Sequence, residues 1–148
     1  MRNIVAAFLL IVAALAITRT PSGSDAARQG IRKAVVQCSV SPLRPGKQGN
    51  QVVATGEVLC DRPGPQKLTY TVHLQRSPDG KQWTTVASQT YTAAGADTTS
   101  ERPVSQRRHT AAAGCASATW RTTVEWTTQD NGTTKNGSDE SGSRRNVC

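Results

Sequence analysis

Large aromatic side chains are scarce in this chain of 148 residues, in which Phe, Trp and Tyr together make up 4%. The basic residues are scattered without aromatic residues between them, so the sequence lacks the pattern of a surface that stacks nucleic-acid bases. Burial of aromatic side chains contributes strongly to the stability of small β domains. We therefore expect Trp83, Trp120 and Trp126 in the core. The alternative is that exposed tryptophans stack on sugar rings or anchor a protein partner.

Signatures of catalysis are also missing. Neither a Gly-x-Ser-x-Gly nucleophile turn nor a glycine-rich phosphate-binding loop occurs, and the chain has only two histidines. His73 belongs to the polar side of an expected strand, and the arginines that precede His109 disfavour its protonation. Ser105, His109 and Asp97 are the residue types of a Ser-His-Asp triad, but no nucleophile motif accompanies them. No two carboxylates stand out as the general acid and base of a glycoside hydrolase. We expect no enzymatic activity and no cofactor.

What the chain does contain near its start is an apolar stretch, Ile4–Ile17, which follows Arg2. This pattern is typical of a secretory signal, with small residues for cleavage at 14–16 or 24–26. Its fourteen residues fall short of the roughly 20 that cross a bilayer, so we expect its removal rather than its retention as an anchor. Residues 1–26 are thus expected to be the signal peptide and its cleavage region, residues 27–33 a flexible lead and residues 34–148 the folded domain. The protein is expected to be secreted, or membrane-tethered if the signal is kept.

The chain has four cysteines, Cys38, Cys60, Cys115 and Cys148. They agree with secretion into an oxidising compartment, because small exported domains commonly contain structural disulfides. Four cysteines allow three pairings, and loop entropy does not choose among them. The positions at the ends of consecutive strands and around the last hairpin favour Cys38–Cys60 and Cys115–Cys148. A zinc site is disfavoured because its ligands usually come in close pairs, which are missing here.

Short alternating runs separated by turn residues predict an all-β domain. The expected strands are Ala34–Val40, Gln51–Cys60, Lys67–Gln75, Gln82–Tyr91, Thr98–Arg108, Cys115–Thr127 and Arg145–Cys148. Ser41–Asn50 and Gln129–Asn146 are expected as polar connections, and Asp79-Gly80 as a tight turn with Trp83 over the core behind it. Cys115 has the wrong parity for the apolar face of its strand, which calls for a bulge near Ala116 or an outward bridge.

The chain is basic, with a formal charge of +8. Beyond residue 26, sixteen Lys and Arg against nine Asp and Glu leave +7. The electrostatic field of a positively charged protein attracts polyanions. Scattered basic residues, however, are more typical of a solvated surface. The candidate partner contacts are Arg107, Arg108, Arg144 and Arg145. We expect an extracellular or cell-envelope partner, with an anionic one among the alternatives, no nucleic acid, and no membrane contact except through a retained signal.

Several segments carry a resemblance to known proteins: Val36–Cys38, Val52–Cys60, Val72–Ala87, Cys115–Trp120 and Val147–Cys148. They resemble the small secreted proteins of actinobacteria and their phages that adopt immunoglobulin-like β-sandwiches. The resemblance implies an immunoglobulin-like two-sheet sandwich of about seven strands, which the spacing of the predicted strands also favours. Because most such proteins have no assigned activity, the resemblance implies no particular function.

Three functional hypotheses remain open at this point. The leading one is an exported, non-catalytic domain that binds a partner at or outside the cell surface through loops or an exposed sheet face. The second is a secreted protease inhibitor or antagonist that inserts a loop, either Asp61–Gln66 or Thr127–Ser143, into another protein's site. The third is a small exported hydrolase.

Overall fold

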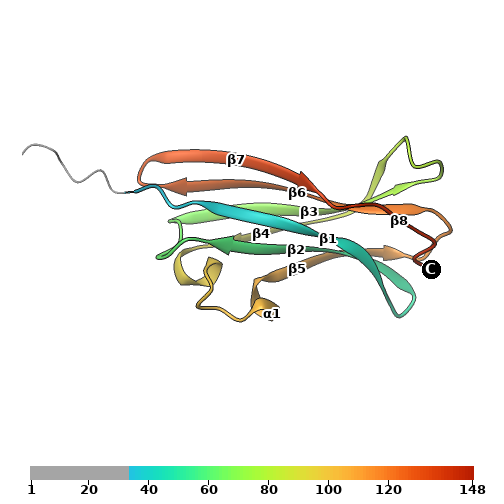
Figure 1. Cartoon of the computed structure of the whole chain (residues 1–148), viewed down its shortest axis with the longest axis horizontal. Coiled ribbons are helices and arrows are strands. Elements are labelled where there is room, and N and C mark those ends of the chain that lie inside the picture. The colour runs from blue at the N-terminus through green and yellow to red at the C-terminus, as the bar shows by residue number, and fades with distance from the viewer. Residues whose placement is uncertain (1–33) are drawn as a thin grey trace, which may run out of the picture. The chain divides into compact units, whose positions relative to one another are not determined.

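The structure is a computed structural model that describes residues 34–148. The expected signal peptide at 1–26 and flexible lead at 27–33 lie outside the described residues. Eight strands make up most of the fold (Figure 1). They are β1 (Cys38–Gln48), β2 (Gln51–Cys60), β3 (Lys67–Ser77), β4 (Thr84–Ala93), β5 (Arg108–Gly114), β6 (Thr119–Asp130), β7 (Thr133–Glu140) and β8 (Arg144–Arg145).

The strands form two antiparallel sheets that face each other. One sheet has the order β1-β2-β5, and the other has the order β4-β3-β6-β7 with β8 paired to β6. In this arrangement the first, second and fifth strands oppose the third, fourth, sixth and seventh, which is the strand distribution of immunoglobulin-like sandwiches. The predicted fold class is therefore confirmed, with eight strands where about seven were expected.

The core lies between the sheets and follows the alternation of the sequence. In β2 and β3 every second residue is buried, including Val52 and Val58 on one sheet and Leu68 and Val72 on the other. Gly56 lets the sheets approach closely, because a Cβ atom there would lie 2.9 Å from Cγ2 of Val72. Successive side chains of a strand point to opposite faces, so the remaining residues of β3 and β6 face solvent.

The predicted position of the first strand was wrong. It was expected at Ala34–Val40 followed by a polar turn at Ser41–Asn50, but β1 runs from Cys38 to Gln48. It includes Pro42 and Pro45, with an irregularity in pairing between Leu43 and Gly46. A proline lacks the amide hydrogen that a central strand needs on both sides, whereas an edge strand pairs on one side only. β1 is an edge strand, so it tolerates both prolines.

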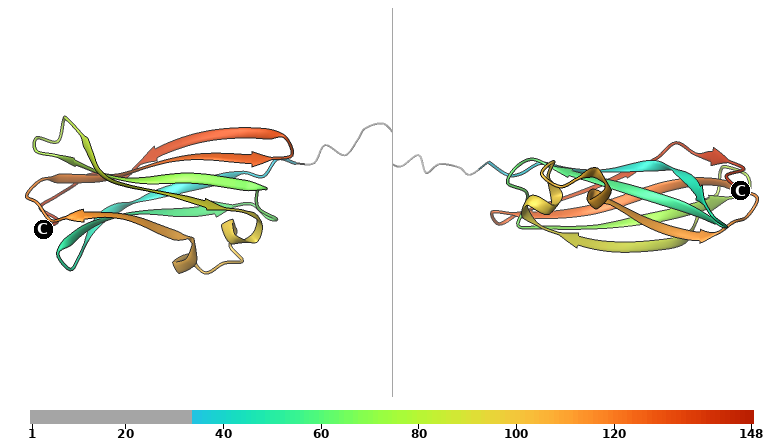
Figure 2. Two further views of the ribbon diagram at one scale, coloured as in Figure 1. Left: turned by 180° about the vertical axis from the view of Figure 1, so that it is seen from behind. Right: turned by 90° about the horizontal axis from the view of Figure 1, so that it is seen from below.

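The prediction of a strand at Thr98–Arg108 was also wrong. A 3-10 turn, η2, occupies Gly95–Thr98, and a single helical turn, α1, occupies Val104–Arg107 immediately after Pro103. Proline is favourable at the start of a helix because the first amide groups have no partner there. Figure 2 shows both turns at the outside of the sandwich, before β5. Among residues 34–148 we find no helix of sufficient length and hydrophobicity to span a membrane.

The polar connection expected at Gln129–Asn146 is largely a strand. β6 continues to Asp130, a two-residue turn follows, and β7 returns antiparallel to β6. Asn131 and Gly132 both have positive φ, 48° and 75°, as a tight hairpin turn of the Asn-Gly kind requires. The seventh strand lacked an alternating apolar signal because it is an exposed edge strand.

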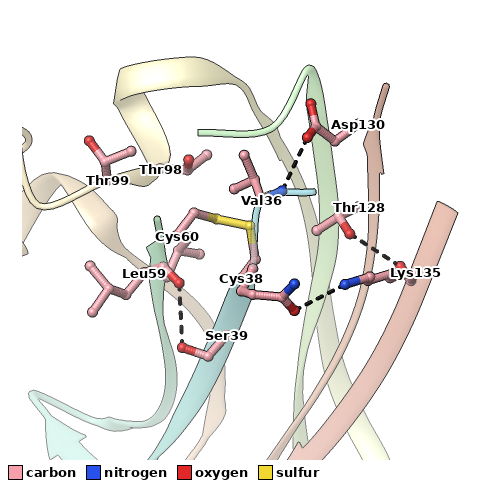
Figure 3. The surroundings of a disulfide bond; sticks show 12 residues. Val36, Cys38, Ser39, Leu59, Cys60, Thr98, Thr99, Thr128, Asp130 and Lys135 are labelled. Atoms are coloured by element: carbon pink, nitrogen blue, oxygen red, sulfur yellow. Dashed lines mark hydrogen bonds between the residues drawn. A yellow bond between two sulfur atoms is a disulfide. The ribbon is translucent and has the colours of Figure 1, made fainter. Parts of the chain in front are cut away.

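Two disulfides are present, Cys38–Cys60 and Cys115–Cys148, the pairs favoured by the sequence. Cys38 and Cys60 are directly opposite each other in the β1–β2 ladder, with their Cα atoms 4.0 Å apart, and Figure 3 shows the bridge beside Val36 and Thr98. Cys115 lies in the β5–β6 loop rather than in a strand. Its parity therefore required neither a bulge near Ala116 nor an outward bridge.

Candidate functional site

Arg107, a predicted partner contact, is buried, with 6% of its surface exposed. Its guanidinium donates hydrogen bonds to the carbonyl oxygens of Val58, at 2.5 Å, and Arg102, at 3.1 Å. It also lies 3.6 Å from a carboxylate oxygen of Glu57. The prediction for Arg107 was wrong because the strand expected there is a helical turn, which directs this side chain onto β2. Arg107 supports the fold rather than a partner contact.

The other three arginines are exposed but do not form one patch. Arg108 pairs with Glu57 at 2.8 Å, which offsets its charge. Arg144 and Arg145 lie on β8, and Arg144 donates a 3.4 Å hydrogen bond to the carbonyl oxygen of Pro45. Figure 1 shows α1, which leads into Arg108, and β8 in different parts of the molecule. The four predicted contacts are therefore not brought together.

Asp97 and His109, two of the residues considered for a hydrolase site, contact other side chains rather than each other. Asp97 accepts a 2.6 Å hydrogen bond from Nε of Arg102. The ring of His109 packs against that of Tyr91, with centroids 4.3 Å apart, and burial lowers the pKa of His109. The direction agrees with the sequence-based expectation for His109, but the cause is loss of solvent rather than neighbouring arginines. Residues 34–148 contain no group of three or more His, Cys, Asp or Glu side chains arranged to hold a metal ion.

The most organised polar surface is the solvent side of the five-stranded sheet, which we call the outer face. It follows from alternation, because the buried residues of β3 and β6 leave their neighbours pointing outward. The outer face is made of Thr85, Ser88, Thr90 and Thr92 from β4; Lys67, Thr69, Thr71, His73 and Gln75 from β3; Arg121, Thr123, Glu125, Thr127 and Gln129 from β6; and Thr134, Asn136, Ser138 and Glu140 from β7.

Strand register aligns these side chains in rows across the sheet. One row joins Thr92, Thr69, Thr127 and Asn136, and the next joins Thr90, Thr71, Glu125 and Ser138. A third row joins Ser88, His73, Thr123 and Glu140, and a fourth joins Thr85, Gln75 and Arg121. Each row thus presents several polar groups at a fixed spacing.

Hydrogen bonds within the rows fix the orientation of many of these groups. The hydroxyls of Thr71 and Thr90 are 2.9 Å apart, and Oγ1 of Thr127 donates to Oδ1 of Asn136 at 2.8 Å. Nε of Arg121 donates to Oε1 of Gln75 at 2.8 Å. Such bonds reduce the side-chain freedom that a ligand would otherwise have to remove.

More contacts of the same kind continue toward both edges of the sheet. Nδ1 of His73 lies 2.7 Å from Oγ of Ser88, and Nε2 of Gln75 donates to Oγ1 of Thr85 at 3.2 Å. On the β7 side, Arg121 forms an ion pair with Glu140 at 2.6 Å. The network therefore extends over all four long strands of the sheet.

Two hollows lie on the outer face along β6 and β7. The larger, of about 640 Å³, is lined by residues of β3, β6 and β7, including Thr71 and Thr127. The second, of about 410 Å³, lies farther along the strands and includes Gln75 and Thr123. Glu125 and Ser138 line both hollows. The two hollows therefore adjoin at Glu125 and Ser138, and we call the pair of hollows the trough, with Glu125 at its centre.

Trp83 marks one end of the outer face. The guanidinium carbon of Arg121 lies 4.3 Å from the centre of its ring, and the side chain is half-buried. The prediction that Trp83 covers the core was wrong, because β4 begins one residue later and the loop before it places the indole on the solvent side. Trp120 is fully buried as expected. Trp126 is partly buried against the core, over Gly137.

No family model matches the chain, and no curated protein matches it. The solution structure of CsgH from R. palustris is similar at 14% sequence identity, covering 70% of this chain and 90% of that chain, with a TM-score of 0.36. A similarity at this level carries no argument about function.

The sequence predicted parts of the outer face on β3 and β6. The alternation of Lys67–Gln75 and Cys115–Thr127 placed Thr69, Thr71 and Glu125 on the polar side. It missed the contribution of β7, because a strand exposed on most of its length has no apolar alternation. The available signal was Asn131-Gly132, which is typical of a two-residue hairpin turn and would have predicted a return strand.

Proposed function

We propose that this domain is an exported, non-catalytic binding module that holds a partner at or outside the cell surface through its outer face. The observation that carries the proposal is the hydrogen-bonded network on that face, with the trough centred on Glu125. A network of this extent orients donors and acceptors before a partner arrives, which lowers the entropic cost of binding. No comparably extended polar array occurs elsewhere among residues 34–148.

The disulfides support the extracytoplasmic part of the proposal. Both bridges lie within residues 34–148, and stable structural disulfides are typical of oxidising compartments. The same argument holds whether the protein is released or remains tethered by an uncleaved signal. It therefore supports a location outside the cytosol without choosing between these two states.

The alternative of a secreted inhibitor is less well supported by the geometry. Its first candidate loop, Asp61–Gln66, folds back on the domain, where Pro65 accepts a 2.9 Å hydrogen bond from the amide of Gly95. Arg62 in that loop pairs with Glu101 at 3.4 Å. Its second candidate, Thr127–Ser143, is mostly the β6–β7 hairpin. Neither segment projects as a free loop, so the sheet face is the better candidate.

A pair of serine variants tests whether the outer face binds. Ser138→Arg places a long side chain in the trough, whereas Ser41→Arg places the same side chain on the exposed side of β1, in the other sheet. Both serines are exposed on edge strands, so the two variants should fold alike. In sedimentation with purified bacterial envelope, we expect Ser138→Arg to weaken binding about tenfold, equivalent to about 1.4 kcal/mol, and Ser41→Arg to bind as the native protein does. Equal binding by the two variants would exclude the outer face, and no sedimentation of the native protein would refute the proposed function.

A further inference from the structure

The outer face is neutral although the chain is basic. Its outward side chains include two basic residues, Lys67 and Arg121, and two acidic residues, Glu125 and Glu140, which balance to zero, while the whole chain carries +8. Arg121 is already paired with Glu140. A polyanion would find no excess positive charge here, and it would meet the exposed carboxylate of Glu125 at the centre of the trough. The outer face therefore fits an uncharged partner better than an anionic one.

The outer face also lacks the apolar centre that a protein partner requires. Energetically important contacts between proteins cluster on buried aromatic and large apolar side chains. Among residues 34–148 the exposed large apolar residues are Leu59 and Val104, and these lie on β2 and α1. The outward positions of the four strands are Thr, Ser, Gln, Asn, His and charged residues, with Trp83 beside one end. This composition disfavours a protein as the occupant.

The trough is long in one direction. The first row contains Thr69 and the fourth contains Gln75, six residues farther along β3. This separation corresponds to about 20 Å at the usual rise of a strand. The two linked hollows follow this direction along β6 and β7. A length of this kind suits an extended chain rather than a single small molecule.

The polar groups match the chemistry of sugars. Hydroxyls of Thr71 and Thr127 and the amide of Asn136 are each fixed by one hydrogen bond and can form another with a ligand. Glu125 has no hydrogen-bond or ion-pair partner among the described residues, and a carboxylate accepts strong hydrogen bonds from ligand hydroxyls. Trp83 places a half-buried indole beside the last row, with the guanidinium of Arg121 against its ring.

We infer that the outer face binds a linear, uncharged polysaccharide, with its hydroxyls on the threonine, asparagine and Glu125 side chains and one end of the chain at Trp83. This inference rests on the proposed function and adds the chemical class of the partner. It also predicts that the basic character of the chain plays no part in the recognition at this face.

The test uses purified neutral polysaccharides, namely glucans, mannans, galactans and arabinogalactan, in affinity electrophoresis of the full chain. We expect at least one to retard the native protein, and to do so equally at about 1 M NaCl, where the Debye length is about 3 Å and charge-led binding is lost. Anionic polysaccharides in the same experiment provide the comparison. Retardation by anionic polymers alone, abolished by salt, would overturn the inference.

Matched carboxylate variants show whether the binding is at the outer face. Glu125→Gln keeps the shape of the side chain and should weaken binding to the neutral polysaccharide about tenfold, because a neutral amide oxygen accepts weaker hydrogen bonds than a carboxylate does. Asp61→Asn makes the same chemical change at an exposed carboxylate on the β2–β3 loop and should leave binding unchanged. Trp83→Ala should also weaken binding. Equal binding by Glu125→Gln and Asp61→Asn would contradict the inference.

Envelope treatments separate this inference from the proposed function. If the envelope binds the native protein and not Ser138→Arg, and loses its binding after digestion by protease, the partner is a protein. In that case the proposed function stands and the polysaccharide inference fails. Binding that survives protease, and that a soluble neutral polysaccharide competes away, supports both.

Discussion

At the scale of single residues, the two tyrosines that face each other across β3 and β4 have opposite environments. The hydroxyl of Tyr70 is buried without a hydrogen-bond partner among the described residues, and loss of solvent, with a contribution from Tyr91, raises its pKa. The hydroxyl of Tyr91 donates a 2.7 Å hydrogen bond to the carbonyl oxygen of Thr110. Alternation in the sequence placed Tyr70 on the same side of its strand as Leu68 and Val72, but alternation does not indicate whether a buried hydroxyl finds a partner.

This contrast gives a paired prediction. Tyr70→Phe removes an unsatisfied buried hydroxyl and should raise the free energy of unfolding by about 1 kcal/mol, whereas Tyr91→Phe removes a satisfied one and should lower it by about 1 kcal/mol. Urea unfolding of the two variants and the native protein measures both effects. A loss of stability in Tyr70→Phe equal to that in Tyr91→Phe would mean that the Tyr70 hydroxyl has a partner in solution.

At the scale of elements, the β3–β4 loop owes its shape to one carboxylate. Oδ1 of Asp79 accepts hydrogen bonds from the amides of Lys81, at 2.8 Å, and Gln82, at 3.0 Å, and from the hydroxyl of Ser77 at 2.9 Å. The backbone bond from Gln82, then that from Lys81, and then the Ser77 hydroxyl lower the pKa of Asp79 from 3.8 to about 2. The sequence predicted a tight turn at Asp79-Gly80; the loop is longer, and this acceptor organises it.

The shifted pKa of Asp79 makes the loop sensitive to acid. Because the folded-state pKa is lower than the unfolded one, the stabilisation is complete above the unfolded value of 3.8 and is lost as the pH falls toward about 2. The native protein should therefore exceed Asp79→Asn in stability at a pH of about 6 and lose most of this advantage at a pH of about 2. Urea unfolding at both pH values measures the difference. A pH-independent difference would show that the carboxylate charge is not the stabilising feature.

β7 shows how an element can be invisible to periodicity. Its residues are polar on both sides, yet all eight pair with β6 from Asp130 to Thr123. Backbone hydrogen bonds depend little on side-chain polarity, so a strand can form wherever a turn returns the chain beside an unpaired edge. Gly137 lies opposite Trp126, where a Cβ atom would overlap the indole ring. Without this strand the outer face would lose one wall of its trough.

At the scale of the whole molecule, the disulfides join different kinds of structure. Cys38–Cys60 links two strands that already pair, and Cys115–Cys148 links the β5–β6 loop to the segment after β8. In that segment Val147 is buried, and the amide of Asn146 donates to the carbonyl oxygen of Ala118 at 3.2 Å. The second bridge therefore keeps the last residues of the chain on the sandwich.

Removal of either bridge should destabilise the domain by a similar amount. The bridged cysteines are 22 and 33 residues apart in sequence, for which loop entropy predicts about 3–4 kcal/mol in each case. Replacement of each cysteine pair by serine, followed by urea unfolding, measures these losses. In hydrogen exchange, the Cys115/Cys148 variant should also lose protection at Asn146, which the Cys38/Cys60 variant should keep. Protection retained in both variants would show that packing of Val147 alone holds the segment.

The sequence by itself determined which residues of β2, β3 and β6 point inward, because alternation of apolar and polar side chains is a local property that follows directly from strand geometry. It also determined the fold class, since regularly spaced short strands require a second sheet to cover their apolar sides. The tertiary structure alone decided that Arg107 is buried against β2 and that Trp83 lies on the solvent side beside Arg121. Each of these depends on pairing between segments distant in sequence, and strand register, rather than any local pattern, brings Thr71, Glu125 and Ser138 into one row.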